Sequence, residues 1–334
     1  MRKSIIRGVG RYLPERIVTN FDLEKIMDTS DQWIRERTGI KERRFADVEK
    51  GETTSYMGAQ AAQKALEMAG LKPSDIDFII FATLSPDYFF PGSGCPLQEH
   101  LGLFGIGAMD IRNQCTGFIY ALSTADQFIK TGMYNNILVV GAEVHTSGLN
   151  LTTEGRDVAV LFGDGAGAVV VSAYDGNDGR GILTNHLHAD GRYARELWVE
   201  APGSRYRPHL NEEILKSGKI YPYMNGRYVF KHAVTRFPEV ILEALKAAKV
   251  KIEDVDLVIP HQANQRITEA VQMRLRLPKE KVFSNIHKYG NTTAASIPIA
   301  MSEAVEQGLI KEGSLVCLAA FGSGFTWASS LIRW

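Results

Sequence analysis

The 334-residue sequence predicts an α/β fold composed of two related halves. Apolar runs of strand length alternate with segments of helix length, an order typical of parallel sheets covered by helices. Residues 73–143 and 251–324 contain the same succession of segments: a buried strand, a polar turn, an apolar helix and a second buried strand. These observations indicate an internal duplication.

Matching positions in the two copies lie at nearly constant separations. Asp77 and Asp256 are 179 residues apart, and Cys115 and Asn291 are 176 apart. The pattern therefore places a thiol of one half opposite an amide of the other. If the halves pack about a pseudo-two-fold axis, we expect Cys115, His261 and Asn291 to meet at one site.

The first half should begin with a strand and continue with helices that end at glycines, which favour helix termination. The expected elements are a strand at 3–10, helices at 21–38 and 53–70, a strand at 78–83, a helix at 116–131, a strand at 137–141, and a hairpin of 158–162 with 167–173. The glycine-rich segment 163–167 inside that hairpin does not fit a dinucleotide-binding loop, because a strand rather than a helix follows it.

The second half repeats the scheme after a polar, glycine-rich break near 174–181. The expected elements are helices at 229–248, 265–276 and 292–307, and strands at 257–260, 315–320 and 326–332. We therefore divide the chain into residues 1–175, which carry the cysteine, and 176–334, which carry the histidine and asparagine. Residues 189–224 lack periodicity and have no counterpart in the first half, so we interpret them as an irregular insertion that forms a lid or binding loop.

Composition excludes several classes of function. The chain has 38 basic and 38 acidic residues, so nothing global indicates nucleic acid or an anionic membrane as a partner. Three cysteines form neither a disulfide framework nor a metal-ligand spacing, which favours a reducing cytoplasmic location. The basic N-terminus lacks the apolar core of a signal peptide, and the apolar runs are too short to span a membrane.

Cys115 is the candidate nucleophile. It lies between a strand-like segment and an apolar helix, where unpaired amides and the helix dipole favour a thiolate. The same amides can stabilise an oxyanion. The alternative is a small buried apolar residue, which is our interpretation of Cys95 and Cys317.

Two polar residues are candidate partners of this nucleophile. His261 follows a buried strand at its carboxyl end, where sites on α/β sheets collect. Asn291 precedes a helix, so a helix cap is the alternative to a role in the site. The N–H of Gly324, at the end of the strand that repeats 137–141, can complete an oxyanion pocket with the N–H of Cys115; an ordinary tight turn is the alternative.

At these residues the sequence resembles β-ketoacyl-acyl-carrier-protein synthase III of the thiolase superfamily, over essentially the whole chain. The resemblance rests on DQWIRERTGI (31–40), NQCTGFIYAL (113–122), LFGDGAGA (161–168), MNGRYVFKHAV (224–234), PHQANQRI (260–267), GNTTAAS (290–296) and FGSGFTWAS (321–329). It implies a five-layered αβαβα fold with two pseudo-symmetric halves, and a homodimer. It also implies that Cys115 accepts the acyl group and that His261 and Asn291 promote decarboxylation.

The resemblance suggests further contacts with coenzyme A. Trp33 and Arg156 match residues that sandwich the adenine, and Arg37 matches a contact to the pyrophosphate end. Asn264 matches a residue that positions a water near His261. No metal or organic cofactor is expected, because the thioesters and the released CO₂ drive the reaction.

The resemblance also extends to protein partners and to the primer. Arg266 matches a basic residue on the surface that meets the carrier protein. Phe90 matches a residue that one subunit contributes to the end of the partner's acyl pocket. Thr116, Ser323 and the long segment 189–224 depart from the pattern, so the primer need not be acetyl.

The expected reaction is the decarboxylating condensation of an acyl-CoA primer with malonyl-acyl-carrier protein through an acyl-Cys115 intermediate, which initiates fatty acid or related biosynthesis. Condensation of two acyl-CoAs, or acyl transfer in secondary metabolism, are alternatives on the same fold. A catalytically silent partner subunit and a Cys–His hydrolase are further alternatives, although the complete Cys, His and Asn set argues against the first.

Overall fold

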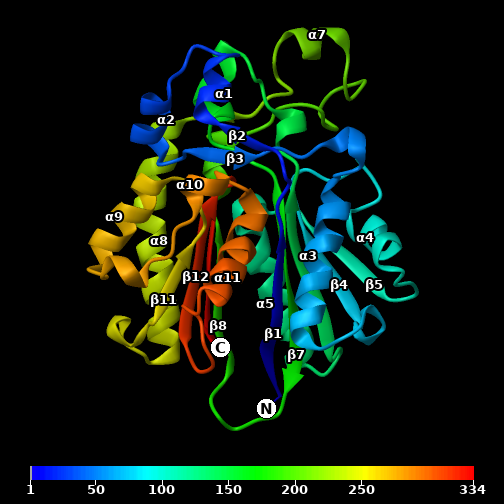
Figure 1. Ribbon diagram of the computed structural model, residues 1–334, viewed down its shortest axis with the longest axis vertical. Coiled ribbons are helices and arrows are strands. Elements are labelled where there is room, and N and C mark those ends of the chain that lie inside the picture. Colours follow the sequence, from blue (N-terminus) through cyan, green and yellow to red (C-terminus); the bar gives the residue numbers. More distant parts are fainter. Residues whose placement is uncertain (1) are drawn as a thin grey trace.

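The computed structural model describes residues 2–334, which form five layers (Figure 1). Two mixed β-sheets enclose a central layer of two helices, α5 (Gly117–Lys130) and α11 (Ser296–Glu306). Helices α3 (Thr54–Ala69) and α4 (Gly94–Leu101) cover the outer face of one sheet, and α8 (Gly226–Ala248) and α9 (Gln265–Leu275) cover the other. The predicted αβαβα order is therefore confirmed.

The first sheet has the strand order β1-β7-β6-β4-β5. Its strands are β1 (Lys3–Tyr12), β4 (Phe78–Ala82), β5 (Gly107–Ile111), β6 (Asn136–Glu143) and β7 (Gly165–Tyr174). Strand β4 pairs in parallel with β5 and β6, whereas β7 is antiparallel to both β1 and β6. Strand β5 forms one edge of this sheet.

The second sheet repeats this arrangement with the order β11-β12-β13-β8. Its strands are β8 (Gly181–Ala189), β11 (Leu257–Pro260), β12 (Leu315–Gly322) and β13 (Thr326–Arg333). Only β11 and β12 are parallel, and β13 is antiparallel to β12 and β8. The sheets expected to be parallel are therefore mixed, with antiparallel strands beside the parallel ones. A tight turn joins β12 to β13, and such a turn connects antiparallel strands without a crossover helix.

The two halves are related by a constant separation of 179 residues. The sequence pattern gave this value for Asp77 and Asp256 but a different one, 176, for Cys115 and Asn291. Oδ2 of Asp77 accepts the N–H of Asn136 at 2.9 Å at the start of β6, and Oδ2 of Asp256 accepts the N–H of Leu315 at 2.7 Å at the start of β12. Both pairs of equivalent residues are 179 positions apart. The two halves thus use the same carboxylate contact to join the same two strands.

The same separation relates the turns before the central helices. The 3₁₀ turns Gln114–Thr116 (η3) and Thr293–Ala295 (η9) both begin at a residue with positive φ, +43° at Gln114 and +46° at Thr293. The structural counterpart of Cys115 is consequently Ala294, and Asn291 lies three positions earlier. The thiol and the amide converge without being equivalent in the duplication.

Three other expectations need correction. The helix expected at 21–38 is two helices, α1 (Asn20–Glu24) and α2 (Asp31–Thr38), because Ser30 caps a new helix through the N–H of Trp33. The hairpin strand expected at 158–162 is absent. Its place is taken by helix α6 (Arg156–Ala159) and an isolated bridge between Phe162 and Asn291. The sequence analysis also missed β2 (Ile17–Thr19), β3 (Glu42–Arg44), β5, β8, α4 and α10 (Ile286–Tyr289).

The insertion 189–224 crosses the end of the second sheet and carries little regular structure. It contains β9 (Leu197–Trp198), α7 (Glu212–Lys216) and β10 (Tyr223–Met224), and α7 projects at the top of Figure 1. Its start is tied to the turn after β12, because Asp190 and Phe325 exchange backbone hydrogen bonds of 2.8 and 3.0 Å. This connection holds the insertion over the same edge that carries His261.

An apolar core lies between the two sheets. Phe118 and Leu122 of α5 and Ile297 and Met301 of α11 are buried there against strands of both sheets. Burial of each such side chain stabilises the fold by roughly 2 kcal/mol. None of the helices within residues 2–334 combines the length and the hydrophobicity that crossing a bilayer would take.

We predict that Gly141→Ala will destabilise the protein by about 1–3 kcal/mol, the usual cost of overpacking. A Cβ at Gly141 in β6 would lie 2.4 Å from the carbonyl oxygen of Ala294 in η9. The measurement is urea unfolding, with Gly203→Ala as a control because Gly203 has open space around it. Equal stability of the two variants would contradict the close packing of β6 on η9.

Candidate active site

Cys115 lies where the two halves meet. Turn η3 places it just before α5, and its side chain packs against Gly322 at the end of β12. It is buried and lines two cavities, of about 840 and 680 Å³. The larger cavity is also lined by His261 and Asn291, so the structure brings the three predicted residues to one site.

The thiol of Cys115 is protonated at rest. Burial, together with the nearby charge of Glu143, raises its pKa to about 12. The backbone N–H groups of Ser323 and of Cys115 itself act in the opposite direction, because hydrogen bonds stabilise a thiolate. Desolvation therefore opposes the thiolate more strongly than the N–H groups at the helix start favour it.

Glu143, at the end of β6, was missed by the sequence analysis. Its carboxylate is buried and accepts hydrogen bonds from the hydroxyls of Thr83 at 3.0 Å and Ser85 at 2.5 Å, and from the N–H of Leu84. Burial still raises its pKa to about 7. Nothing in its local sequence separates it from other strand-end acids, because its influence on Cys115 depends on how β6 and η3 lie within the first half.

His261 presents one ring nitrogen to the cavity. Its Nδ1 lies 2.6 Å from Oγ of Ser296, and that hydroxyl accepts the N–H of Gln262 at 3.4 Å. Ser296 can therefore donate its own proton to Nδ1, which leaves the imidazole proton on Nε2. Nε2 is buried without a partner, and burial lowers the histidine pKa to about 3. The side chain is a neutral donor aimed into the cavity.

Asn291 lines the same cavity as His261 and keeps its side-chain NH₂ group free as a hydrogen-bond donor. Its backbone is held by Leu161 and Gly163, and its Oδ1 accepts the N–H of Thr293 at 2.9 Å. It does not cap helix α11, whose N-cap is Ala295. Because the carbonyl end of the amide is engaged by its own turn, the NH₂ group remains for a ligand in the larger cavity.

The second backbone donor at the thiol belongs to Ser323. The backbone N–H of Ser323 is the group that hydrogen-bonds the Cys115 sulfur. Gly324, with φ of +133°, does not line either cavity. The structure therefore favours Ser323 over Gly324 as the oxyanion donor. The hydroxyl of Ser323 also donates to the carbonyl of Leu197, which anchors the insertion over the site.

Residues expected to contact coenzyme A lie at the mouth of the larger cavity. Trp33 and Arg37 line it, and the guanidinium carbon of Arg37 lies 4.4 Å from the Trp33 ring. Arg156 lies 5.8 Å from the same ring but outside the lining, where it pairs with Asp28 at 3.0 Å. Arg156 must leave this ion pair, or share it, to stack on an adenine.

Asn264 and Arg266 also line the larger cavity, at the start of α9. Asn264 is the N-cap of this helix, since its Oδ1 accepts the N–H of Arg266 at 2.9 Å. Its Nδ2 donates to the carbonyl of Arg37 at 2.9 Å, which joins α9 to α2. Asn264 thus has a structural role, and its predicted hold on a water stays a prediction.

Phe90 does not reach the cavities of its own chain. Its side chain is 81% exposed, whereas the adjacent Phe89 lines the smaller cavity. The role of Phe90 in the acyl pocket of a second subunit stays a prediction.

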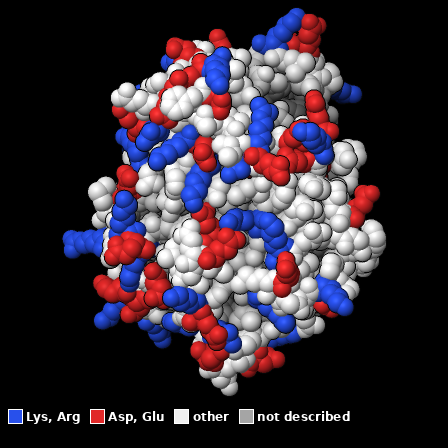
Figure 2. Space-filling model, in the orientation of Figure 1, with Lys and Arg blue, Asp and Glu red and all other residues white. Residues whose placement is uncertain are grey.

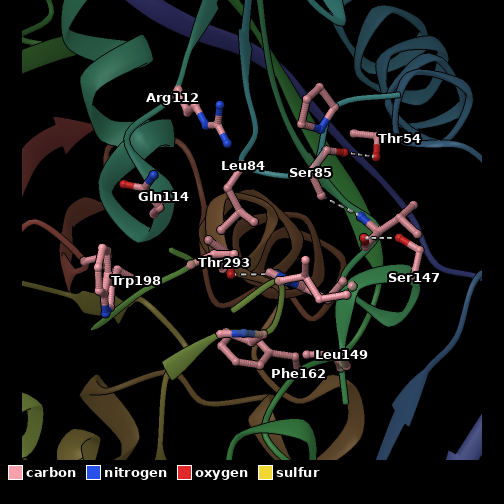
Figure 3. A pocket seen from close by; sticks show the side chains of 18 of the residues that line it. Thr54, Leu84, Ser85, Arg112, Gln114, Ser147, Leu149, Phe162, Trp198 and Thr293 are labelled. Atoms are coloured by element: carbon pink, nitrogen blue, oxygen red, sulfur yellow. Dashed lines mark hydrogen bonds between the residues drawn. The ribbon is translucent and has the colours of Figure 1, made fainter. Parts of the chain in front are cut away.

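The wall of the smaller cavity is mostly apolar (Figure 3). Leu84, Leu149, Phe162 and Trp198 form much of its wall. His145, which the sequence analysis did not single out, also lines this cavity, with Nε2 2.7 Å from the hydroxyl of Thr293. Within residues 2–334, no three His, Cys, Asp or Glu side chains come close enough to hold a metal ion.

Comparisons with known sequences agree with this geometry. Residues 109–191 match the family model described as 3-oxoacyl-[acyl-carrier-protein] synthase III, and residues 245–334 match the model of its C-terminal part. A β-ketoacyl-[acyl-carrier-protein] synthase III of Caldanaerobacter subterraneus subsp. tengcongensis is 49% identical over 98% of this chain and 97% of its own length.

Solved structures give the same result. A 3-oxoacyl-[acyl-carrier-protein] synthase III from Aquifex aeolicus matches with a TM-score of 0.90 and 48% identity, over 99% of this chain and 100% of that one. The priming β-ketosynthase of the R1128 polyketide pathway matches with a TM-score of 0.89 and 32% identity, over 99% and 96%. The fold and site thus define a condensing acyltransferase of the thiolase fold. The chain belongs to the β-ketoacyl-[acyl-carrier-protein] synthase III family, as its sequence motifs predicted.

We predict that alkylation of Cys115 by iodoacetamide will rise about tenfold per pH unit between roughly pH 7 and 9, without a plateau, because only the thiolate reacts. A raised pKa means that the thiolate fraction keeps growing over this range. Peptide mass spectrometry separates the Cys115 adduct from that of the exposed Cys95, which is alkylated in the same samples. A plateau for Cys115 below about pH 8 would contradict the burial effect.

Proposed function

We propose that this enzyme transfers an acyl group from acyl-CoA to Cys115 and then condenses it with malonyl-acyl-carrier protein, releasing CO₂. The observation that carries this proposal is the position of Cys115 at the junction of two cavities. One cavity is wide, has basic side chains at its mouth and reaches His261 and Asn291. The other is largely apolar near the thiol, as an acyl pocket requires.

The acylation step uses the N-terminal half together with the end of β12. The Cys115 sulfur attacks the thioester carbonyl, and the N–H groups of Cys115 and Ser323 stabilise the negative charge on the oxygen. The thiol proton leaves with the CoA thiol, so atoms and charge balance. Because the resting thiol is protonated, these N–H donors must stabilise the negative charge that develops as the sulfur gives up its proton.

The condensation step uses the two donors of the C-terminal half. After CoA leaves, malonyl thioester enters the larger cavity and loses CO₂. The electron pair of the broken bond forms an enolate, whose oxygen accepts hydrogen bonds from Nε2–H of His261 and the NH₂ of Asn291. A neutral histidine that donates suits this role, since a base is not needed to form the enolate. The enolate carbon then attacks the acyl-Cys115 thioester, the carbon–sulfur bond breaks, and the released Cys115 thiolate takes up a proton from solvent to restore the thiol.

We propose the same division of labour for the two halves: residues 1–175 supply the nucleophile, and residues 176–334 supply the decarboxylation pair. Trp33, Arg37 and Arg156 would hold the nucleotide part of CoA, Asn264 a water near His261, and Arg266 the carrier protein. The chemistry needs no metal or organic cofactor, because loss of CO₂ drives the new carbon–carbon bond. A reducing cytoplasm is the location that a free catalytic thiol favours.

We further propose a homodimer formed through the edge of the first sheet. Strand β5 pairs only with β4, which leaves its other edge unpaired, and the exposed Tyr88, Phe89 and Phe90 follow β4 closely in the chain. Unpaired edges with exposed aromatic residues favour pairing with a second chain. In such a dimer, Phe90 could close the acyl pocket of the partner.

The proposal predicts separable effects of two substitutions. Cys115→Ala should abolish formation of the acyl-enzyme on incubation with acyl-CoA, while Cys95→Ala should acylate like the wild type. Asn291→Ala should acylate normally but lower the release of CO₂ from malonyl-acyl-carrier protein by about 100-fold or more, the usual effect of losing one oxyanion donor. Intact-protein mass spectrometry and labelled CO₂ measure the two steps.

Loss of acylation in Asn291→Ala as severe as in Cys115→Ala would refute the separation of roles. Steady turnover of acyl-CoA without malonyl thioester would indicate a hydrolase instead.

A further inference from the structure

The wall of the smaller cavity contains a cation without a counter-ion. Arg112 follows β5, three residues before Cys115, and its guanidinium points into the cavity toward Leu84 (Figure 3). Gln114 lines the same cavity. In the part of the chain that the structure describes, neither side chain makes a hydrogen bond, and Arg112 forms no ion pair. Both side chains therefore offer donors to whatever occupies the space.

Two acidic side chains close to Arg112 in the chain or in the cavity wall, those of Asp87 and Asp110, already accept hydrogen bonds from other groups. Asp87 also lines the cavity, but its carboxylate accepts the N–H of Ser55 at 3.1 and 3.3 Å, at the start of α3. Asp110, two residues before Arg112, accepts the N–H groups of Ser93 at 2.6 Å and Gly94 at 2.9 Å. Neither carboxylate lies within ion-pair distance of Arg112. The charge of Arg112 is thus left for a ligand.

The remaining lining sets the character of that ligand. Leu84, Leu149 and Phe162 also line the cavity, and their apolar side chains suit the methylene groups of an acyl chain. Arg112 is exposed to solvent at the edge of the cavity, so a chain that ends in a methyl group would displace some of its water and offer no hydrogen bond in return. A chain that ends in a carboxylate would replace them with two charge-assisted bonds in the fork geometry of arginine.

We propose that the primer is an acyl-CoA whose chain ends in a carboxylate, the mono-thioester of a dicarboxylic acid, and that Arg112 and Gln114 bind that carboxylate. This inference rests on the proposed acylation of Cys115. The apolar wall then spans the methylene groups, and Arg112 discriminates by the charge at the far end. The acylation chemistry is unchanged, since only the choice of primer depends on Arg112.

The test compares primers of equal carbon number. Glutaryl-CoA is set against pentanoyl-CoA, and adipyl-CoA against hexanoyl-CoA, and the rate of Cys115 acylation is followed by intact mass. We expect the wild type to prefer the carboxylated member of at least one pair. Arg112→Met should lower that preference by about 10- to 100-fold, as expected for loss of a charged hydrogen bond. Arg112→Lys should retain part of it, and the exposed Arg7→Met is the control that leaves the ratio unchanged.

The outcomes separate this inference from the reaction itself. If pentanoyl-CoA and hexanoyl-CoA acylate Cys115 at least as fast as their carboxylated partners, or if Arg112→Met leaves the ratio unchanged, the inference fails while the acyl-enzyme still supports the proposed function. A preference for ω-hydroxyacyl-CoA over the carboxylated primer would refute recognition by charge. Absence of acylation by every CoA thioester would refute the proposed function and this inference with it.

Discussion

The contact between Cys115 and Gly322 is the constraint on which the site depends. A Cβ at Gly322 would lie 2.5 Å from the Cβ of Cys115 and 2.6 Å from its sulfur, so only glycine allows the end of β12 to reach η3. This approach brings a turn of one half against a strand of the other. It also aims the N–H of Ser323 at the sulfur. The nucleophile, its oxyanion donors and the opening of both cavities follow from this one close contact.

The duplicated halves share a backbone fold but carry different reactive side chains. Turns η3 and η9 have the same shape and lead into the two central helices, and the position equivalent to Cys115 is occupied by Ala294. The second half instead contributes Asn291 before its turn and His261 after β11. The result is one asymmetric site rather than two symmetric ones. The absence of a side chain at Gly141 lets the backbone of η9 at Ala294 pack against β6.

The sequence was informative where function is encoded locally. Cys115, His261 and Asn291 could be predicted because each stands at the end of a strand or the start of a helix within a motif. Properties set by contacts distant in the chain could not be predicted. The high pKa of the Cys115 thiol arises from burial and from Glu143, which comes from another strand. Arg112 lacks an ion pair because Asp87 and Asp110 accept hydrogen bonds from other residues. The role of Ser323 depends on the path of the backbone in the turn after β12.

The most direct test of the account is a crystal structure of the Cys115→Ala variant with an intact acyl-CoA bound. The account predicts the nucleotide and pantetheine in the larger cavity, beside Trp33 and Arg37, and the acyl chain in the smaller one. The thioester oxygen should face the N–H groups of residue 115 and Ser323. An acyl chain that lies in the larger cavity, or a carbonyl oxygen directed away from these two groups, would contradict it.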